Sequence, residues 1–315
     1  MRALLCPASL KGVLSAPAAA AALARGVRAG GGDALELPIA DGGEGTAEAL
    51  AAALGGEWRG TVVSDPLGRP VSVRWLFLGD GRAVVEAAAA IGLPLLAPAE
   101  RDPLVASSRG FGELVQAALR ESPRALLVGL GGSATVDGGA GMREVLRDLP
   151  VRTTVLCDVR TTLADAARIF GPQKGAGPDV VLVLERRLVA MDVLRPFAEI
   201  PGAGAAGGLG AALAALGAEL VPGASTLLDL VGFDARMHGC DLVVTGEGQV
   251  DGTTAEGKAP GVVAARCADA GIRCVVFGGR VVEAIVGVET VSLSGEPERA
   301  ETDLEELGRR LTMAA

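Results

Sequence analysis

The chain of 315 residues contains only three lysines, against 26 arginines. Each of them stands beside a glycine, in Leu10-Lys11-Gly12, Gln173-Lys174-Gly175 and Gly257-Lys258-Ala259. The lysine ammonium is a compact and mobile charge, whereas the arginine guanidinium is a planar fork. A chain that uses arginine almost everywhere keeps lysine where a compact charge is needed, and phosphate binding is one such need. We therefore predict phosphate chemistry at Lys11, Lys174 and Lys258; the alternative is a codon bias that spared three lysines by chance.

Three glycine-rich clusters follow strand-like segments, and each also contains carboxylates. The first runs from Ala40 to Thr46 and includes Gly42 and Gly43. Its glycines permit close backbone approach and lead into a helix N-terminus that can bind an anion. Asp41 and Glu44 are placed to bind a metal ion or a substrate hydroxyl. The alternative is a plain turn with an acidic helix cap.

The second cluster runs from Gly129 to Gly141. The backbone amides around Gly131 and Gly132 are suited to phosphate binding. The polar contacts in this cluster are Ser133, Thr135 and Asp137. The segment partly matches the dinucleotide fingerprint G-x-G-x-x-A, which leaves an NAD-dependent oxidoreductase as an alternative, but a second group of glycines after Asp137 fits that turn poorly.

The third cluster runs from Thr245 to Gly252 and continues to Lys258. Residues 252–258 match the phosphate-binding pattern G-x-x-x-x-G-K, but the next residue is Ala259, so the hydroxyl that would contact Mg²⁺ is missing. We therefore expect Lys258 to serve phosphate in another geometry. Glu247 and Asp251 are the carboxylates of this cluster.

Composition narrows the class of protein. Half of the residues are apolar, 46 are glycine and aromatic residues make up 3%, which is typical of an α/β protein with a large aliphatic core. The net charge of −9 argues against a nucleic-acid surface and favours small polar metabolites. No signal-peptide pattern and no uninterrupted apolar run of membrane-spanning length occur, so we expect a cytoplasmic protein without a membrane partner. Five cysteines without a C-x-x-C pair predict reduced thiols, and the single histidine, His238, disfavours zinc and Ser-His-Asp chemistry.

The order of elements predicts two α/β domains. Short apolar runs alternate with alanine-rich helical stretches near both ends of the chain, which indicates a doubly wound, Rossmann or flavodoxin-like domain from residues 1–60 and 236–315. Between them, residues 61–235 open with consecutive strands separated by hairpin turns and are predicted to form an inserted mixed α/β domain. The strands are expected at 3–6, 33–39, 61–64, 71–78, 82–87, 125–128, 153–159, 241–245 and 273–277. The cleft between the two domains is the expected site.

Taken together, the motifs resemble the type I glycerate kinases along nearly the whole chain. The segments that carry the resemblance are Pro7–Lys11, Ala40–Thr46, Gly129–Gly141, Phe170–Ala176, and Thr245–Gly252 with Gly257-Lys258. The resemblance implies transfer of the ATP γ-phosphoryl group to D-glycerate, most often at the 2-hydroxyl, with ATP and Mg²⁺ as cofactors. It also implies two α/β domains. A homodimer is compatible with the resemblance, and the sequence does not decide the oligomeric state.

Carried over position by position, the resemblance implies a role for each acidic and basic residue. Asp41 or Asp158 would accept the proton of the substrate hydroxyl, and Glu247 and Asp251 would hold Mg²⁺. Lys11, Lys174 and Lys258 would meet the phosphates and the glycerate carboxylate. Further candidates for that carboxylate are Arg69, Arg101 and Arg109.

The chain departs from the family pattern at three places. Ala8 stands where an aspartate is usual, the stretch after Asp158 reads Arg160-Thr161-Thr162-Leu163, and the region between Met142 and Phe170 is short. These departures leave two alternatives open: an impaired paralogue that binds a nucleotide or hydroxy acid as a regulator, and a kinase for another small hydroxy acid.

Overall fold

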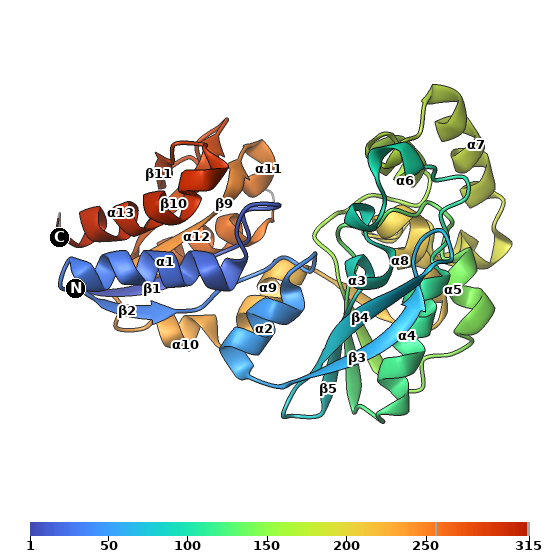
Figure 1. Cartoon of the computed structure of the whole chain (residues 1–315), viewed down its shortest axis with the longest axis horizontal. Coiled ribbons are helices and arrows are strands. Elements are labelled where there is room, and N and C mark those ends of the chain that lie inside the picture. The colour runs from blue at the N-terminus through green and yellow to red at the C-terminus, as the bar shows by residue number, and fades with distance from the viewer. Residues whose placement is uncertain (256, 314–315) are drawn as a thin grey trace. The chain divides into compact units, whose positions relative to one another are not determined.

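Two separate sheets organise the chain into two units (Figure 1). In the computed structural model, which describes residues 1–255 and 257–313, unit 1 comprises residues 1–41, 48–54 and 224–315, and unit 2 comprises residues 42–47 and 55–223. The division thus falls after residues 54 and 223, against predicted boundaries after 60 and 235. The earlier boundary has a physical reason, because β3 begins at Glu57, where the backbone already pairs with Phe77, and not at Thr61.

Unit 1 contains a five-stranded parallel sheet in the order β2-β1-β9-β10-β11. Renumbered within the unit, this order is 2-1-3-4-5, the flavodoxin-like arrangement, which confirms the predicted doubly wound fold. The strands are β1 (Arg2–Pro7), β2 (Asp33–Glu36), β9 (Leu242–Val250), β10 (Arg273–Val281) and β11 (Glu289–Ser292). The helices are α1 (Ala16–Ala29), α2 (Thr46–Leu54), α9 (Gly223–Leu230), α10 (Phe233–Met237), α11 (Gly252–Ala255), α12 (Ala259–Ala270), the 3-10 helix η5 (Pro297–Arg299) and α13 (Ala300–Met313).

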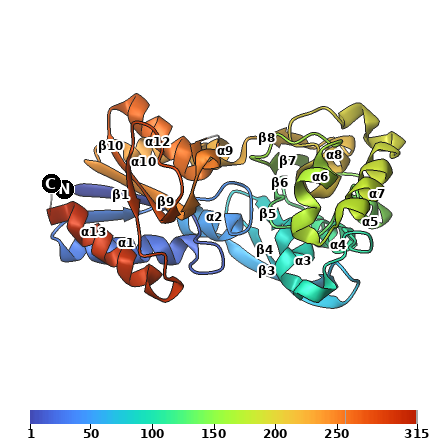
Figure 2. The same cartoon turned by 90° about the horizontal axis from the view of Figure 1, so that it is seen from above.

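Local sequence explains the first elements of unit 1. The buried, continuously apolar run of β1 is what a parallel strand covered on both faces requires. Ser15 caps α1 by accepting a hydrogen bond from the Ala18 backbone N–H at 3.3 Å, and Gly30 ends the helix. Helices α1 and α13 pack together on one face of the sheet, around Leu23 and Leu307, and α12 covers the other face, as Figure 2 shows.

Strands β9 and β10 are longer than the sequence predicts. Their expected ends were Thr245 and Phe277, but pairing continues to Val250 and Val281. The third glycine-rich cluster therefore begins inside a strand instead of in a turn. Close packing explains the glycine there, because a Cβ on Gly246 would lie 2.2 Å from the Phe277 carbonyl oxygen.

Unit 2 contains a six-stranded mixed sheet in the order β3-β4-β5-β6-β7-β8. The first two pairings are antiparallel and the last three are parallel, as predicted for a mixed domain. The strands are β3 (Glu57–Ser64), β4 (Pro70–Phe77), β5 (Arg82–Glu86), β6 (Ala125–Gly129), β7 (Arg152–Leu156) and β8 (Glu219–Val221). The helices are α3 (Ala87–Ile91), η1 (Leu93–Leu95), η2 (Pro98–Glu100), α4 (Arg109–Arg120), α5 (Ala140–Val145), α6 (Ala166–Phe170), η3 (Pro172–Lys174), α7 (Pro178–Val189), η4 (Asp192–Phe197) and α8 (Ala205–Ala215).

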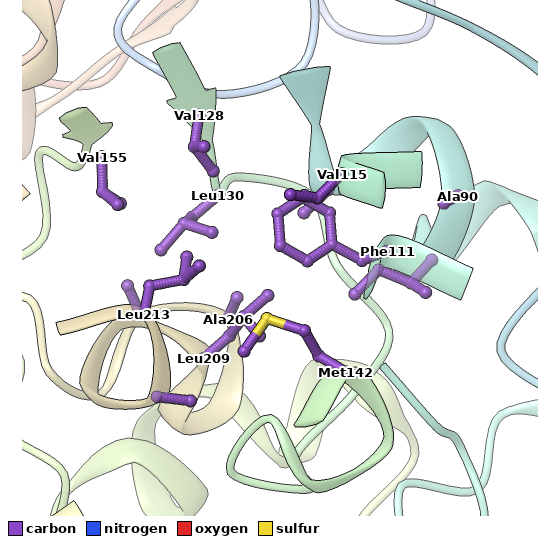
Figure 3. Close-up of a cluster of buried hydrophobic side chains, with 14 of the residues drawn as sticks. Ala90, Phe111, Val115, Val128, Leu130, Met142, Val155, Ala206, Leu209 and Leu213 are labelled. Carbon is purple, nitrogen blue, oxygen red and sulfur yellow. The ribbon is translucent and has the colours of Figure 1, made fainter. Parts of the chain in front are cut away.

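The core of unit 2 lies between this sheet and its helices. Figure 3 shows Phe111 of α4 pointing into a cluster that also contains Leu130, Met142 and Leu209, and Phe111 is fully buried. Strand β7 ends at Leu156, three residues earlier than predicted, because its partner β8 offers pairing only as far as Val221. The residues that follow, including Asp158, are therefore in a connection at the carboxyl end of the strand.

Candidate active site

Unit 1 has a cavity of about 380 Å³ beside the carboxyl ends of β1 and β9. These two strands are the point at which the strand order of the sheet reverses, and ligands of open α/β sheets bind at that point. The predicted site residues of this unit all line the cavity: Lys11, Asp41, Glu247, Asp251 and Lys258. Strand order, which the sequence motifs do not specify, thus brings together charged residues that are up to 247 positions apart in the chain.

Glu247 is held inside the cavity by a neighbouring hydroxyl and an ammonium. Its Oε1 accepts a hydrogen bond from Thr254 Oγ1 at 2.8 Å and lies 3.7 Å from Lys258 Nζ. Burial raises the pKa of the Glu247 carboxyl, and the positive charge of Lys258 opposes that rise. The negative charge of Asp41 also raises the pKa of Glu247, so these two acids are close enough to interact electrostatically.

Asp251 has the opposite tendency. Its Oδ1 accepts hydrogen bonds from the Thr253 N–H at 3.0 Å and from Thr253 Oγ1 at 2.5 Å, and its Oδ2 accepts one from Gln249 Nε2 at 2.9 Å. These hydrogen bonds, first those of Thr253 and Gln249, lower the pKa of Asp251 to about 2. Asp251 is therefore a permanent anion at neutral pH.

Lys258 joins the two carboxylates. Its Nζ lies 3.7 Å from Asp251 Oδ1, the same distance as from Glu247 Oε1. Lys258 also occupies the N-cap position of the twelve-residue helix α12, where unpaired backbone N–H groups and the helix dipole favour an anion. Lys11 lines the same cavity from the turn after β1.

The carboxylates of the cavity fit a magnesium ion bound in the manner usual for nucleotide enzymes. Magnesium commonly takes one or two carboxylates and completes its shell with water and substrate phosphates. Glu247 and Asp251 supply two carboxylates on one wall of the cavity. In residues 1–255 and 257–313, no group of three or more His, Cys, Asp or Glu side chains is arranged to enclose a metal, so an all-protein cage is not the binding mode that these residues offer.

Unit 2 brings its glycine-rich loops into backbone contact at the carboxyl ends of β6 and β7. A Cβ on Gly131 would lie 2.5 Å from Gly43 Cα, and a Cβ on Gly42 would lie 2.7 Å from Leu156 Cβ. Gly42 also has a φ of +90°, a conformation that favours glycine. These glycines are thus required for packing between loops, in addition to any ligand contact. Gly132 lies near Glu44, because a Cβ on Gly132 would be 3.8 Å from Glu44 Oε2.

Glu86 is a candidate that the sequence reasoning missed. It is the last residue of β5 and pairs in register with Gly129 of β6. Its Oε1 accepts a hydrogen bond from the Thr46 N–H at 2.9 Å, while Thr46 Oγ1 donates to the Gly43 carbonyl at 2.8 Å. Glu86 therefore holds the first glycine-rich loop. The signal that could have identified it is an acid at the end of the apolar strand segment Arg82–Glu86.

Lys174 is enclosed in unit 2 and is bonded to the second glycine-rich loop. Its Nζ donates to Ser133 Oγ at 3.1 Å and to the Thr135 carbonyl at 2.8 Å, and the residue is only 2% exposed. Burial lowers the pKa of Lys174 to about 7, and the negative charge of Asp137 opposes that shift. The hydroxyl of Thr135 is buried and has no hydrogen-bond partner in the described part of the chain. Ser133, Thr135 and Lys174 thus form one polar cluster, in which the lysine is already bonded to the loop.

Asp137 is saturated by groups of its own unit. Its Oδ2 accepts from the N–H and Oγ of Ser108, both at 2.8 Å, and from the Gly141 N–H at 3.1 Å. Its Oδ1 accepts from the Gly139 N–H at 3.1 Å. These four bonds organise the loop between β6 and α5 and tie it to the start of α4. The structure thereby gives Asp137 a positioning role.

Asp158 lies in the connection that follows β7 and is half-buried. It belongs to the same carboxyl edge of the unit 2 sheet as the loops after β5 and β6.

The cysteines are all unpaired thiols. Burial raises the pKa of Cys157, the neighbour of Asp158, to about 11. No helix in residues 1–255 and 257–313 has the length and apolarity needed to cross a bilayer.

Comparisons with known proteins agree with the architecture of both units. The profile described as Glycerate kinase family matches residues 3–149 and 147–295. Glycerate 2-kinase of Escherichia coli strain K12 is 40% identical over 307 residues, and glycerate kinase of Bacillus subtilis strain 168 is 40% identical over 305, each alignment covering 82% of this chain and 80% of the relative. A crystal structure assigned as glycerate kinase 2 from Salmonella typhimurium LT2 superposes with a TM-score of 0.84 at 33% identity, over 100% of this chain and 98% of that one. The chain belongs to the glycerate kinase family, a family of kinase enzymes.

Proposed function

We propose that the protein transfers the γ-phosphoryl group of ATP to the 2-hydroxyl of D-glycerate, forming 2-phospho-D-glycerate and ADP in the presence of Mg²⁺. Membership of the glycerate kinase family supports the reaction class, and a relative named glycerate 2-kinase supports the acceptor position. The observation that carries the proposal is the unit 1 cavity at the reversal point of a parallel sheet, where two lysines, Lys11 and Lys258, line the same cavity as the acids Asp41, Glu247 and Asp251; Arg280, Glu296 and Asp303 also line it. Phosphoryl transfer needs charge neutralisation and positioning more than covalent chemistry, and this cavity supplies both.

In this proposal the unit 1 cavity binds the nucleotide. Lys11 and Lys258 contact the phosphates, aided by the N-terminus of α12. Glu247 and Asp251 hold Mg²⁺, which when bound neutralises charge on the phosphates. The pKa of Asp251 is low enough to keep its carboxylate ionised, and binding a cation near Glu247 would offset the effect of burial on that carboxyl.

Unit 2 binds the hydroxy acid in this proposal. Its polar groups at the carboxyl edge of the sheet include Ser133, Thr135 and Glu44. The acceptor proton passes to a carboxylate, either Asp41 of unit 1 or Asp158 of unit 2. The choice between them is testable, because Asp→Asn removes the proton acceptor with little change in shape; the true base should show a loss of kcat of about 100-fold or more.

The experiment that tests the function is direct. The protein is incubated with ATP, Mg²⁺ and D-glycerate, ADP release is followed with a coupled assay, and the product is identified by phosphorus NMR. We expect 2-phospho-D-glycerate. A 3-phospho product would overturn the regiochemistry, and nucleotide binding without turnover over a panel of small hydroxy acids would favour a regulator over a kinase.

Asp251→Asn provides a check on the metal role. This change removes the negative charge but keeps a side chain of similar shape, so the Mg²⁺ concentration needed for half-maximal rate should rise several-fold. Glu283→Gln, an exposed acid whose carboxylate lies near Gly252 but does not line the cavity, is the matched control and should leave the magnesium response unchanged. An unchanged response in Asp251→Asn would remove Asp251 from the metal site.

A further inference from the structure

A hydroxy acid brings a carboxylate that must be neutralised, and the structure discriminates among the three arginines considered for that task. Arg69 donates from Nε to Asp65 at 2.6 Å and from Nη1 to Glu100 at 2.6 Å. Arg109 donates from Nε to Glu113 at 3.0 Å and from Nη1 to Glu144 at 2.9 Å. Both guanidinium groups are therefore already committed to carboxylates of their own unit.

Arg101 is not committed. Within the described residues it forms no ion pair, and its Nε–H is buried without a hydrogen-bond acceptor. A buried donor that has lost water and gained no partner destabilises the protein, and more so when the donor group is charged. Such a cost is expected where a ligand supplies the missing acceptor. A carboxylate is the natural partner, since it can accept two parallel bonds from a guanidinium.

The position of Arg101 supports this interpretation. It follows η2 in the connection between β5 and α4, at the same carboxyl edge of the sheet as the loops after β6 and β7. Its backbone packs directly on Gly175, where a Cβ would lie 2.2 Å from the Arg101 carbonyl oxygen and 3.1 Å from Arg101 Cβ. Gly175 has a φ of +97°, so this contact depends on glycine for both conformation and space.

The contact with Gly175 places the Arg101 backbone beside the segment that carries Lys174. Lys174 immediately precedes Gly175, is buried, and has no carboxylate in ion-pair contact in the part of the chain that the structure describes. Among the described residues, the acid that acts on Lys174 electrostatically is Asp137, which is saturated by four other donors. Two adjacent segments thus carry a guanidinium and a lysine side chain that form no ion pair within the described residues, and the unpartnered Thr135 hydroxyl belongs to the loop to which Lys174 is bonded.

We propose that Arg101 binds the carboxylate of the acceptor hydroxy acid and thereby selects acids over neutral polyols and amides. This inference rests on the proposed function and adds to it the residue that determines substrate class. Arg101 is a binding residue in this assignment, because its guanidinium contacts a part of the substrate that does not react.

Two other arginines define the competing assignments. Arg143, in α5, also has a buried nitrogen without a partner, but its helix packs against α4, with Gly112 close to the Met142 backbone. Arg160 follows Asp158 in the connection after β7, and it is exposed. Both enter the experiment as tests of the assignment to Arg101.

The experiment compares the wild-type enzyme with R101Q and R101K. In R101Q, KM for D-glycerate should rise about 10- to 100-fold, the range expected for losing a charged hydrogen-bonded contact. KM for ATP should stay within about twofold, since the nucleotide is assigned to unit 1. R101K keeps the positive charge but not the planar guanidinium, so its KM for D-glycerate should lie between that of the wild type and that of R101Q. R186Q, which removes one exposed positive charge from α7, is the matched control and should behave as wild type.

Two further readouts separate binding from folding. D-glycerate should raise the unfolding temperature of the wild type and of R186Q but not of R101Q. The preference of the wild type for D-glycerate over its neutral amide, glyceramide, should fall at least tenfold in R101Q, because glutamine cannot discriminate charge.

The possible outcomes distinguish this inference from the proposed function. A wild-type enzyme without activity on D-glycerate would remove the proposed function itself. An active wild type with unchanged KM and unchanged amide discrimination in R101Q would overturn the assignment of Arg101 alone. A rise in KM for D-glycerate in R143Q or R160Q, without one in R101Q, would likewise overturn it.

Discussion

Substituting Lys174 by methionine should change how the stability of unit 2 depends on pH. Methionine has a similar length and volume but carries no ionisable group. Lys174 is fully enclosed, and burial lowers its pKa from 10.5 to about 7 in the native protein. The unfolded chain exposes the same side chain to water, where it titrates near 10.5.

The sign of the effect follows from counting protons. Below pH 7 the lysine is protonated in both states, and the native state carries the full cost of a buried ammonium. Between pH 7 and 10.5 the unfolded chain binds a proton that the native protein does not, so the free energy of unfolding rises with pH. This one residue should add about 2–3 kcal/mol of stability between pH 6.5 and 9, since one pH unit in this window corresponds to about 1.4 kcal/mol.

The chain offers a convenient probe for this measurement. It has two tryptophans and no tyrosine, and both Trp58 and Trp75 lie in unit 2, on β3 and β4. Urea unfolding followed by tryptophan fluorescence at several pH values from 6.5 to 9 therefore reports on the unit that contains Lys174. As the pH rises from 6.5 to 9, the free energy of unfolding of the wild type should increase by about 2–3 kcal/mol relative to that of K174M. R186M, which removes an exposed positive charge from α7, should run parallel to wild type, and a pH-independent difference for K174M would refute the reasoning.

Three more outcomes follow from the packing and the thiols. Phe111→Ala should destabilise unit 2 by about 3–5 kcal/mol in the same fluorescence assay, because its ring is fully buried among helices and sheet. Gly131→Ala should destabilise the unit by about 1–3 kcal/mol and reduce kcat/KM, because its methyl group would meet Gly43 Cα at 2.5 Å; normal activity with normal stability would contradict the loop packing. The thiols should react slowly with a disulfide reagent at pH 8 in the native protein and all five should react after denaturation, because burial raises the pKa of Cys6 and Cys157; rapid native labelling of Cys6 would contradict this burial.

The fold class could be read from the sequence because its signals are local. Apolar runs such as Ala3–Cys6 and alanine-rich helices such as α1 identify themselves by period and by their caps. The boundaries of β9 and β10 could not be read in this way. Their glycine-rich ends look like turns, and it is the pairing between the two strands, from Gly246 with Phe277 to Val250 with Val281, that keeps them extended. Helix α7 was also not predicted, because only Leu184 and Leu188 of its apolar residues are buried, while Leu182, Val183 and Val189 are exposed and blur the apolar stripe.

The candidate site was predictable in its residue types but not in its partners. The lysines and acids of the glycine-rich clusters predict phosphate chemistry from sequence alone. Their environments depend on contacts between distant segments, such as that of Lys174 with Thr135. The same holds for Asp137, whose four donors come partly from Ser108 on another connection. Glu86 was missed because nothing near it in the chain shows that its carboxylate caps Thr46.

The contrast between arginine and lysine that begins with composition has a physical basis in the structure. At Lys258 one ammonium lies equally far, 3.7 Å, from two carboxylates on different residues, a geometry suited to a point charge rather than to a planar fork. At Lys174 the side chain is enclosed, and a guanidinium would have to stay charged there because its pKa is too high to yield to burial. Lysine can lose its proton near pH 7 in that position and still donate to Ser133 and Thr135. Arginine serves where a planar fork is useful, and the proposed role of Arg101 follows from that geometry, because its Nε–H is buried without an acceptor among the described residues and a guanidinium can donate two parallel bonds to a carboxylate.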